Sequence, residues 1–228
     1  MTREEFLKVL PSLVENYQPL PEVKAKISDV DLLMIVGATG VGKTSIIKRL
    51  GIPFVITDTT RPIRPDEIDG SDYYFRTDYD QLVNDIKTQK FVQVNIFPTG
   101  DFYGTRDSAY PHLGFAVYAV VADRISEFRT LGFSDTITAF ITPPSFLEWM
   151  GRIDRHNSES DQLAKRLDEA KRSFSFALND KQTHFILNDD LETAVRQTGA
   201  LLNGKADATL EAKAMQAAQQ IYQELTFA

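Results

Sequence analysis

The chain has 228 residues and carries 25 Lys and Arg against 32 Asp and Glu, a formal net charge of -7. This length suits one large domain, or one core with smaller inserts. The absence of cysteine excludes disulfides, cysteine zinc sites, iron–sulfur clusters and a thiol nucleophile, and the acidic balance argues against a protein that coats nucleic-acid polymers.

Residues 2–16 predict a helix, because apolar side chains recur on one helical face and charges occupy the others. Pro11 interrupts this pattern, so the segment is either two short helices or one kinked helix. Pro19 and Pro21 then end the pattern. The apolar stripe consists of Phe6, Leu10, Leu13 and Val14.

The apolar run from Asp31 to Gly37 predicts a buried parallel strand, and a glycine-rich turn leads from it into a helix over 43–50. The rest of the chain alternates strands with helices, which predicts βαβ units in an α/β fold with a three-layer core and a mainly parallel sheet. The further strands are expected at 53–56, 115–122, 134–141 and 183–187, and the helices at 123–131, 145–154, 161–178 and 190–202.

Residues 57–105 differ from this background. Turn residues, aromatics and alternation at 73–75 and 91–97 predict a small, mainly β insert with a helix at 79–88. The tail from Ala208 predicts an amphipathic helix packed on the core. Its apolar stripe is Leu210, Ala214, Ala217, Ala218, Ile221 and Leu225.

The segment MTREEFLKVL is charged from its third residue and has no apolar stretch of the kind found in signal peptides. The longest apolar runs, at 32–36 and 115–122, are far shorter than the roughly 18 residues that suggest a membrane span. We therefore expect a cytoplasmic protein that has no membrane partner.

The segment GATGVGKT fits the phosphate-loop pattern G-x-x-x-x-G-K-[ST], between a predicted strand and a predicted helix. Its glycines let the backbone turn N–H groups around a phosphate, Lys43 can reach the outer phosphates, and the Thr44 hydroxyl can bind Mg²⁺. The pattern predicts nucleotide binding. The expected contacts are Gly37, Ala38, Thr39, Gly40, Val41, Gly42, Lys43, Thr44 and Ser45.

A phosphate loop alone does not separate a switch GTPase, a motor and a small-molecule kinase, but the N-K-x-D guanine motif of switch GTPases is absent. Arg61 and Arg64 can converge as a fork on one phosphate, and Tyr73 and Tyr103 can add phenol donors. Taken alone, two exposed arginines and two core tyrosines would be the simpler interpretation.

Together these segments resemble the guanylate kinase family of P-loop nucleoside monophosphate kinases. Residues 57–75 are similar to its motif S-S-T-T-R-x-P-R-x-G-E-x-D-G-x-D-Y-x-F, and residues 100–105 resemble G-N-Y-Y-G-[ST]. Residues 185–191 are similar to V-I-V-N-D-D-L. The resemblance runs in the family's order from about Leu32 to Leu202.

The resemblance implies an ATP-binding core, an acceptor-binding insert and a short arginine-bearing lid. The core would comprise residues 31–56, 106–150 and 168–206, the insert 57–105 and the lid 151–167. Residues 1–30 would form a helical extension and 207–228 a C-terminal helix packed on the core.

The implied reaction is ATP plus GMP giving ADP plus GDP, with Mg²⁺. The expected partners are small-molecule nucleotides, and the expected assembly is a monomer or a homodimer. The catalytic residues would be Lys43, Arg61, Arg152, Arg155 and Arg166. Asn188 would join the ATP site, Thr44 and Asp123 would serve the metal, and the acceptor site would comprise Thr57, Arg61, Arg64, Tyr73, Gln93, Tyr103 and Thr105.

The base-reading positions depart from the family. The family reads two guanine donors with a carboxylate, which only accepts, whereas this chain has Gln93; a second carboxylate is also lost, and only Asp123 lies nearby. Three interpretations follow: a GMP kinase in which Thr57, Thr105 or Asp58 supplies the missing acceptor, a kinase for another (deoxy)nucleoside monophosphate, or a non-catalytic binding module. The complete phosphate loop disfavours the third.

Overall fold

A computed structural model describes residues 1–97, 99–154 and 160–227. The chain divides into two compact units. The first comprises residues 1–30, 53–116 and 131–134, and the second comprises 31–52, 117–130 and 135–228. Residues 1–30, predicted to form a helical extension, lie in the same unit as residues 57–105.

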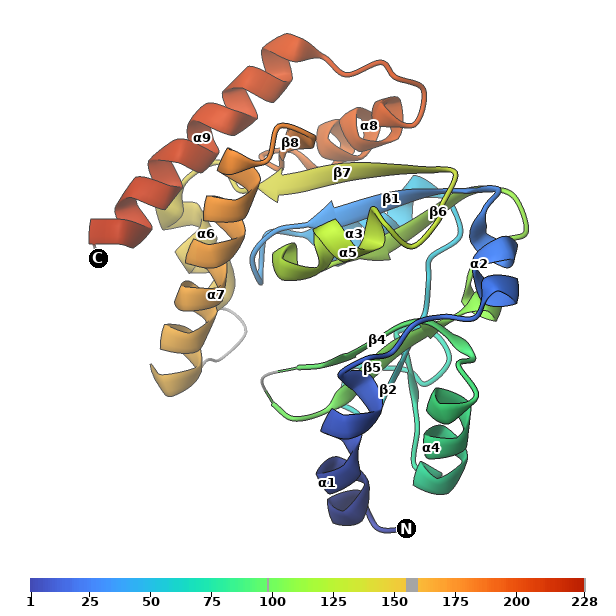
Figure 1. The fold of residues 1–228 in the computed structure, drawn as a ribbon. Coiled ribbons are helices and arrows are strands. Elements are labelled where there is room, and N and C mark those ends of the chain that lie inside the picture. The colour runs from blue at the N-terminus through green and yellow to red at the C-terminus, as the bar shows by residue number, and fades with distance from the viewer. Residues whose placement is uncertain (98, 155–159, 228) are drawn as a thin grey trace. The chain divides into compact units, whose positions relative to one another are not determined.

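Sheet A belongs mainly to the second unit and has the strand order β6-β1-β7-β8 (Figure 1). Its strands are β1 (Val30–Val36), β6 (Gly114–Ala119), β7 (Asp135–Thr142) and β8 (Thr183–Leu187). β7 pairs in parallel with both β1 and β8. The mainly parallel sheet and the α/β fold class are thus as predicted, and β1 is almost fully buried because helices cover both faces of the sheet.

Helices of the second unit connect and cover these strands. They are α3 (Lys43–Leu50), α5 (Ile125–Phe128), α6 (Phe146–Asp154), α7 (Ser160–Asn179), α8 (Leu191–Leu201) and α9 (Ala208–Phe227), with a short 3-10 turn at Ala122–Arg124. α3 packs against α8, and α7 packs against α9. Asp190 caps α8, because its carboxylate accepts a hydrogen bond from the Thr193 N–H at 2.9 Å.

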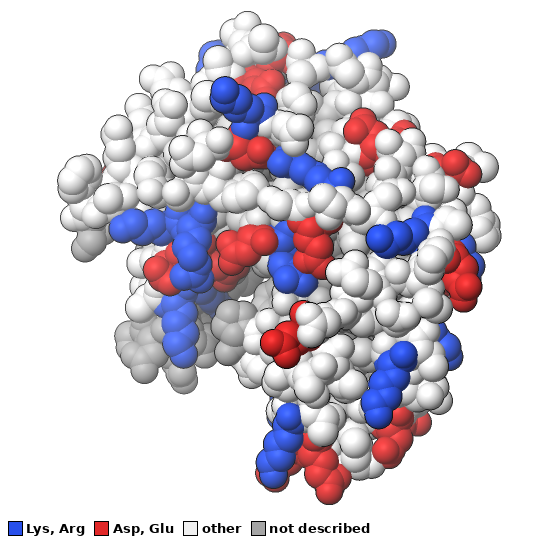
Figure 2. Space-filling view, in the orientation of Figure 1, with Lys and Arg blue, Asp and Glu red and all other residues white. Residues whose placement is uncertain are grey.

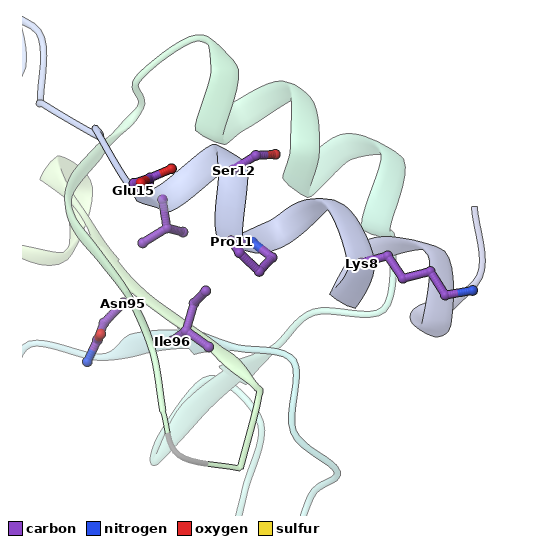
Figure 3. Close-up of a pocket in the computed structure, with 7 residues that line it drawn as sticks. Lys8, Pro11, Ser12, Glu15, Asn95 and Ile96 are labelled. Carbon is purple, nitrogen blue, oxygen red and sulfur yellow. The ribbon is translucent and has the colours of Figure 1, made fainter.

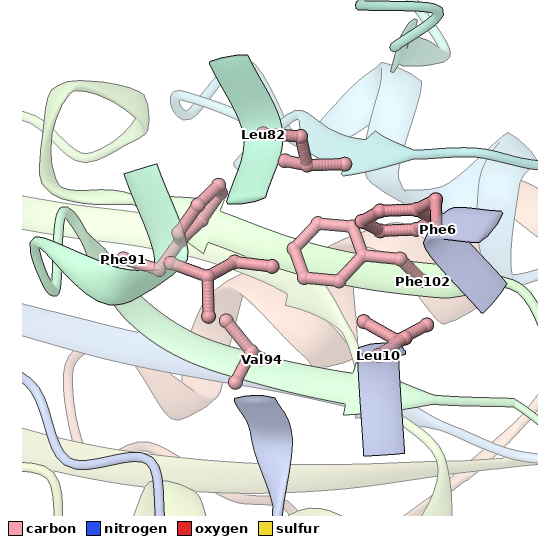
Figure 4. Packing of buried hydrophobic residues seen from close by; sticks show 7 residues of the cluster. Phe6, Leu10, Leu82, Phe91, Val94 and Phe102 are labelled. Atoms are coloured by element: carbon pink, nitrogen blue, oxygen red, sulfur yellow. The ribbon is translucent and has the colours of Figure 1, made fainter. Parts of the chain in front are cut away.

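Sheet B belongs to the first unit and has the strand order β3-β2-β5-β4. Its strands are β2 (Thr57–Thr59), β3 (Tyr73–Phe75), β4 (Phe91–Ile96) and β5 (Phe102–Arg106). The helices of this unit are α1 (Arg3–Val14), α2 (Pro21–Ile27) and α4 (Tyr79–Lys87), with a 3-10 turn at Asp107–Ala109. One face of sheet B packs against α1 and α4, and Figure 4 shows this aromatic and aliphatic core.

The N-terminal helix settles the question raised by Pro11. α1 is a single helix with Pro11 inside it, begun by a capping box in which Thr2 and Glu5 satisfy each other's backbone N–H groups. α1 ends at Val14, before the proline pair at 19 and 21, and Pro21 opens α2, a helix the sequence does not predict. Proline suits the first helical position because that N–H has no intrahelical partner.

Two predicted elements differ in the structure. Residues 53–56 form no strand beyond an isolated bridge at Phe54, and the strand begins at Thr57 and joins sheet B. The helix predicted at 123–131 is only a 3-10 turn followed by the four residues of α5. The chain then reaches Gly132, whose φ of +104° suits glycine.

In the described parts of the chain, no helix combines the length and apolar character that crossing a membrane requires. Figure 2 shows acidic and basic side chains interspersed on the face drawn.

Candidate active site

The phosphate loop lies in the second unit, between β1 and α3. Gly37, Gly40 and Gly42 all have positive φ angles, of +143°, +82° and +99°, as a loop that turns its N–H groups inward requires. A Cβ on Gly37 would lie 2.8 Å from the Ile141 carbonyl oxygen of the neighbouring strand β7. Glycine is therefore needed there for both its conformation and its size.

Lys43 begins α3, and its ammonium group turns back onto the loop. It donates hydrogen bonds to the carbonyl oxygens of Gly37 at 2.6 Å and Ala38 at 2.8 Å. Burial lowers the pKa of Lys43 to about 8, and the negative charge of Glu169 on α7 opposes this fall. Glu169 is a residue that sequence reasoning missed, because its position on a charged helix face carries no motif.

Asn188, predicted to join the ATP site, is a buried residue that follows β8 and packs directly on the phosphate loop. Its side-chain amide donates to the Val41 carbonyl oxygen at 2.7 Å, and its backbone N–H donates to Thr142 of β7 at 2.8 Å. A Cβ on Gly42 would lie 2.2 Å from the Asn188 Nδ2 atom. Asn188 therefore fixes the loop and explains the size limit at Gly42.

Trp149, on α6, holds the opposite part of the loop. Its indole N–H donates to the Thr39 carbonyl oxygen at 2.8 Å, and the side chain is fully buried. A Cβ on Gly40 would lie 3.2 Å from Ile153 of the same helix and 3.8 Å from the Trp149 nitrogen. This hydrogen bond to the loop is a contact for which the sequence contains no motif.

The predicted lid arginines are only partly described. Arg152, at the end of α6, donates to the Asn188 carbonyl oxygen at 3.0 Å and lies 3.9 Å from Glu148, so it borders the phosphate loop. Arg166 lies on α7 and is half-buried. Arg155 lies outside the described residues.

The two predicted metal-side residues differ in setting. Thr44 is exposed at the start of α3, where its hydroxyl oxygen is a hard ligand of the kind that Mg²⁺ accepts beside phosphate oxygens. Asp123 is exposed on the 3-10 turn that follows β6. In the described segments, no group of three or more His, Asp or Glu is placed so that it could hold a metal ion.

Strand register places the predicted acceptor residues on one face of sheet B. Directly paired residues point to the same face, and neighbours along a strand point to opposite faces. Thr57 pairs with Tyr73, Thr59 with Tyr103, and Gln93 with Thr105. Because Tyr103 and Thr105 are two apart on β5, all of these side chains share one face, which we call the acceptor face.

Arg61 lies beside the acceptor face and is already fully engaged. Its two terminal nitrogens donate to the Glu67 carboxylate at 2.6 and 2.5 Å, and its Nε donates to the Tyr103 hydroxyl at 3.1 Å. Burial alone would lower the pKa of Arg61, but the hydrogen bonds and charge of Glu67 raise it above the ordinary value. Arg61 in turn lowers the pKa of Glu67.

The predicted fork of two arginines is therefore uneven. The Arg61 guanidinium lies 4.7 Å from the centre of the Tyr73 ring, and the residue is only 8% exposed, whereas Arg64 is exposed. The Arg64 backbone N–H donates to Glu67 at 2.9 Å, which fixes the turn that carries it. Arg64 presents a guanidinium to solvent, and Arg61 orients Tyr103.

Gln93 is buried on the acceptor face, 3% exposed. Thr105, its partner across the strands, is fully buried and exchanges a hydrogen bond with the Tyr110 hydroxyl at 3.0 Å. Thr57 is buried on the same face. Hydroxyl and amide groups thus line this face where the related motif has a carboxylate.

Asp58 points to the other face. It pairs with Gly104, so it lies opposite to Gln93 and Thr105, and it is buried between two arginines. Arg76 donates to its oxygens at 2.8 and 3.0 Å and Arg106 at 2.8 Å; Arg106 also pairs with Asp85 of α4 at 2.8 Å. The suggestion that Asp58 supplies a missing acceptor to the base is therefore wrong: this carboxylate joins sheet B to α4.

Comparisons with known proteins identify the family of the chain. The guanylate kinase family model matches residues 30–205. A guanylate kinase of Synechococcus sp. strain JA-3-3Ab is 30% identical over 75% of this chain and 81% of the relative, and that of Thermotoga maritima is 28% identical over 76% and 86%.

A solved structure, the guanylate kinase from Anaplasma phagocytophilum, is similar in fold, with a TM-score of 0.57 and 20% identity over 81% of this chain and 90% of that one. The family model covers more than half of the chain, and it includes the phosphate loop and the acceptor face. The chain belongs to the guanylate kinase family of nucleoside monophosphate kinases.

Proposed function

We propose that the protein transfers the γ-phosphoryl group of ATP to GMP, giving ADP and GDP, with Mg²⁺. The observation that carries this proposal is the acceptor face of sheet B, where Thr57, Tyr73, Gln93, Tyr103 and Thr105 share one side. The membership of the chain in the guanylate kinase family supports the same acceptor.

The phosphate loop supports the ATP half of the reaction. The loop N–H groups and the N-terminus of α3 attract phosphate oxygens, and Lys43 would exchange its carbonyl partners for them. The exposed Thr44 hydroxyl would hold Mg²⁺ together with phosphate oxygens, and the metal would neutralise charge on the transferring group. Asn188 and Trp149 keep the loop in this conformation.

The acceptor face supports the binding of a monophosphate. Exposed Arg64 would pair with the acceptor phosphate, and the phenols of Tyr73 and Tyr103, ordered by Arg61, would add donors. The attacking phosphate oxygen is already an anion, so no general base is required and catalysis rests on positioning and charge neutralisation.

Gln93 decides which base is accepted. An amide offers one acceptor and one donor, so its oxygen can take one guanine N–H while its NH₂ group faces the guanine oxygen. The second guanine donor would then need a hydroxyl of Thr57 or Thr105. The alternative acceptor is a nucleotide whose base presents one donor beside one acceptor, and the buried carboxamide at Gln93 is the observation that favours it.

The test measures ADP formation from ATP and Mg²⁺ with GMP, dGMP, IMP, AMP, CMP and UMP in turn. We expect the highest kcat/KM with GMP, and Gln93→Glu should raise the preference for GMP over IMP, because a carboxylate accepts from both guanine donors. Asn84→Asp is the matched control: it adds the same charge at an exposed position of α4, which packs on the opposite face of sheet B, and it should leave the preference unchanged.

Turnover of another monophosphate in place of GMP would replace the proposed acceptor. An absence of turnover with all six nucleotides would refute the proposed reaction.

A further inference from the structure

Residues 1–29 precede the segment that the family model matches, yet they complete the unit that carries the acceptor face. Phe6 and Leu10 of α1 are fully buried against side chains of α4, β4 and β5. Figure 4 shows both residues inside this cluster. The other buried members are Leu82, Ile86, Phe91, Val94 and Phe102. Without α1, the part of the opposite face of sheet B that α4 does not cover would be exposed.

Tyr17, three residues after α1 ends, is hydrogen-bonded to strand β4 at a single residue. Its hydroxyl donates to the Phe91 carbonyl oxygen at 2.7 Å and accepts from the Phe91 N–H at 2.8 Å. β4 is the edge strand of sheet B, so the phenol takes the place of a neighbouring strand there. Burial raises the pKa of Tyr17 to about 12, which keeps the donor protonated. Gln93 is two residues further along β4.

Arg3, at the start of α1, reaches strand β5. Its guanidinium pairs with the Asp101 carboxylate, which is buried immediately before β5 and two residues from Tyr103. The motif that residues 100–105 resemble has asparagine at this position, so this chain has a buried charge where the motif has a neutral amide. The cation that balances it comes from the segment before the family match.

α1 and the end of β4 do not pack closely along their whole length. A groove lies there, lined on the α1 side by Lys8, Pro11 and Ser12 and on the strand side by Asn95 and Ile96 (Figure 3). Two polar contacts, Tyr17 with Phe91 and Arg3 with Asp101, thus join the N-terminal segment to the strands that carry Gln93 and Tyr103, in addition to the apolar cluster.

We propose that Tyr17 and Arg3 are positioning residues for the acceptor nucleotide. Tyr17 fixes the main chain of β4 next to Gln93, and Arg3 neutralises Asp101 next to Tyr103. The inference rests on the proposed function, because it assigns these residues to the binding of the monophosphate and not to the binding of ATP.

Tyr17→Phe tests the first anchor. It removes both hydrogen bonds and keeps the ring, so the KM for GMP should rise about fivefold, the factor that corresponds to roughly 1 kcal/mol for a hydrogen bond. The KM for ATP and the kcat should stay within about twofold. Tyr79→Phe is the matched control, because Tyr79 stacks on Phe6 of the same cluster while its hydroxyl has no hydrogen-bond partner among the described residues.

Arg3→Gln tests the second anchor, and Asp101→Asn provides its rescue. Arg3→Gln leaves a buried carboxylate without its cation, so the KM for GMP should again rise about fivefold or more. The double variant Arg3→Gln, Asp101→Asn should return the KM to within about twofold of the starting protein. A role in folding alone would lower the unfolding midpoint and would leave the ratio of the two KM values unchanged.

The outcomes separate the inference from the proposed function. If Tyr17→Phe or Arg3→Gln raises both KM values equally, or changes neither, the positioning role is refuted although the kinase reaction stands. If the starting protein turns over no GMP, the proposed function fails. Amide hydrogen exchange of the free protein then decides: faster exchange of Phe91–Arg106 in Tyr17→Phe but not in Tyr79→Phe supports the anchor, and equal exchange overturns it.

Discussion

Gly42 and Asn188 provide a test of how the phosphate loop is held. A Cβ at Gly42 would lie 2.2 Å from the Asn188 amide nitrogen, far inside van der Waals contact, and its φ of +99° is strained for any other residue. Gly42→Ala should therefore cost about 1–2 kcal/mol for the backbone and about 1–3 kcal/mol for the overlap. Asn188→Ala removes the bond to the buried Val41 carbonyl, at about 1–3 kcal/mol.

In the double variant the overlap is absent and only the backbone strain and the lost bond remain. The combined cost should thus be smaller than the sum of the single costs by about 1–3 kcal/mol. Urea unfolding followed by the fluorescence of Trp149, the only tryptophan of the chain, reports the unit that contains the loop. The KM for ATP should also rise in these variants, and it should rise more in the variants that lose more stability.

Gly51→Ala is the matched control. Gly51 has a positive φ of +69° but nothing within 4 Å of a Cβ. The Gly51→Ala variant should therefore lose stability only through backbone strain, and its cost should add to that of Asn188→Ala without coupling. Additive costs for Gly42→Ala and Asn188→Ala would refute the reasoning, because they would mean that the amide does not lie against the loop.

Three further predictions concern charge. The pKa of Lys43 is lowered to about 8, so kcat/KM for ATP should fall above about pH 8 as the ammonium group loses its proton. Glu169→Gln should move that fall to lower pH in a pH–rate profile. An unmoved profile would contradict the interaction between Lys43 and Glu169. The free energy of unfolding should rise between about pH 8 and the ordinary lysine value of 10.5, because the unfolded chain binds the extra proton there. Asp58→Asn should destabilise the first unit by about 3 kcal/mol in urea unfolding, because Arg76 and Arg106 lose their buried partner. It should leave the base preference unchanged, because Asp58 lies on the face opposite to Gln93. A changed preference in the six-nucleotide assay would overturn that assignment.

Local patterns in the sequence predicted much of the fold. The phosphate-loop pattern placed the glycine turn between β1 and α3, and apolar runs predicted β7 and β8 within a residue or two of their ends. These elements carry their own signals: glycines for positive φ angles, and short apolar runs for strands buried on both faces. The short strands of sheet B were harder, because β2 and β3 have only three residues each.

The sequence could not show which side of a strand a residue takes in the assembled sheet. Asp58 adjoins Thr57 and Thr59 in a motif, yet it faces the opposite way because strand neighbours alternate. Side-chain contacts could not be predicted either. The indole of Trp149 donates a hydrogen bond to Thr39, and Glu67 accepts hydrogen bonds from Arg61 of the same motif. Such roles depend on packing and register, which no local pattern encodes.

The last helix has a consequence for how molecules of this kinase meet one another. β8 is an edge of sheet A, and α9 packs along it; the Glu211 carboxylate accepts from the Phe185 N–H at 3.3 Å and contacts His184 at 3.0 Å. An uncovered edge strand is a template onto which the sheet of a second chain can add. α9 occupies one backbone donor of this edge and packs along the strand, and both features oppose such an addition.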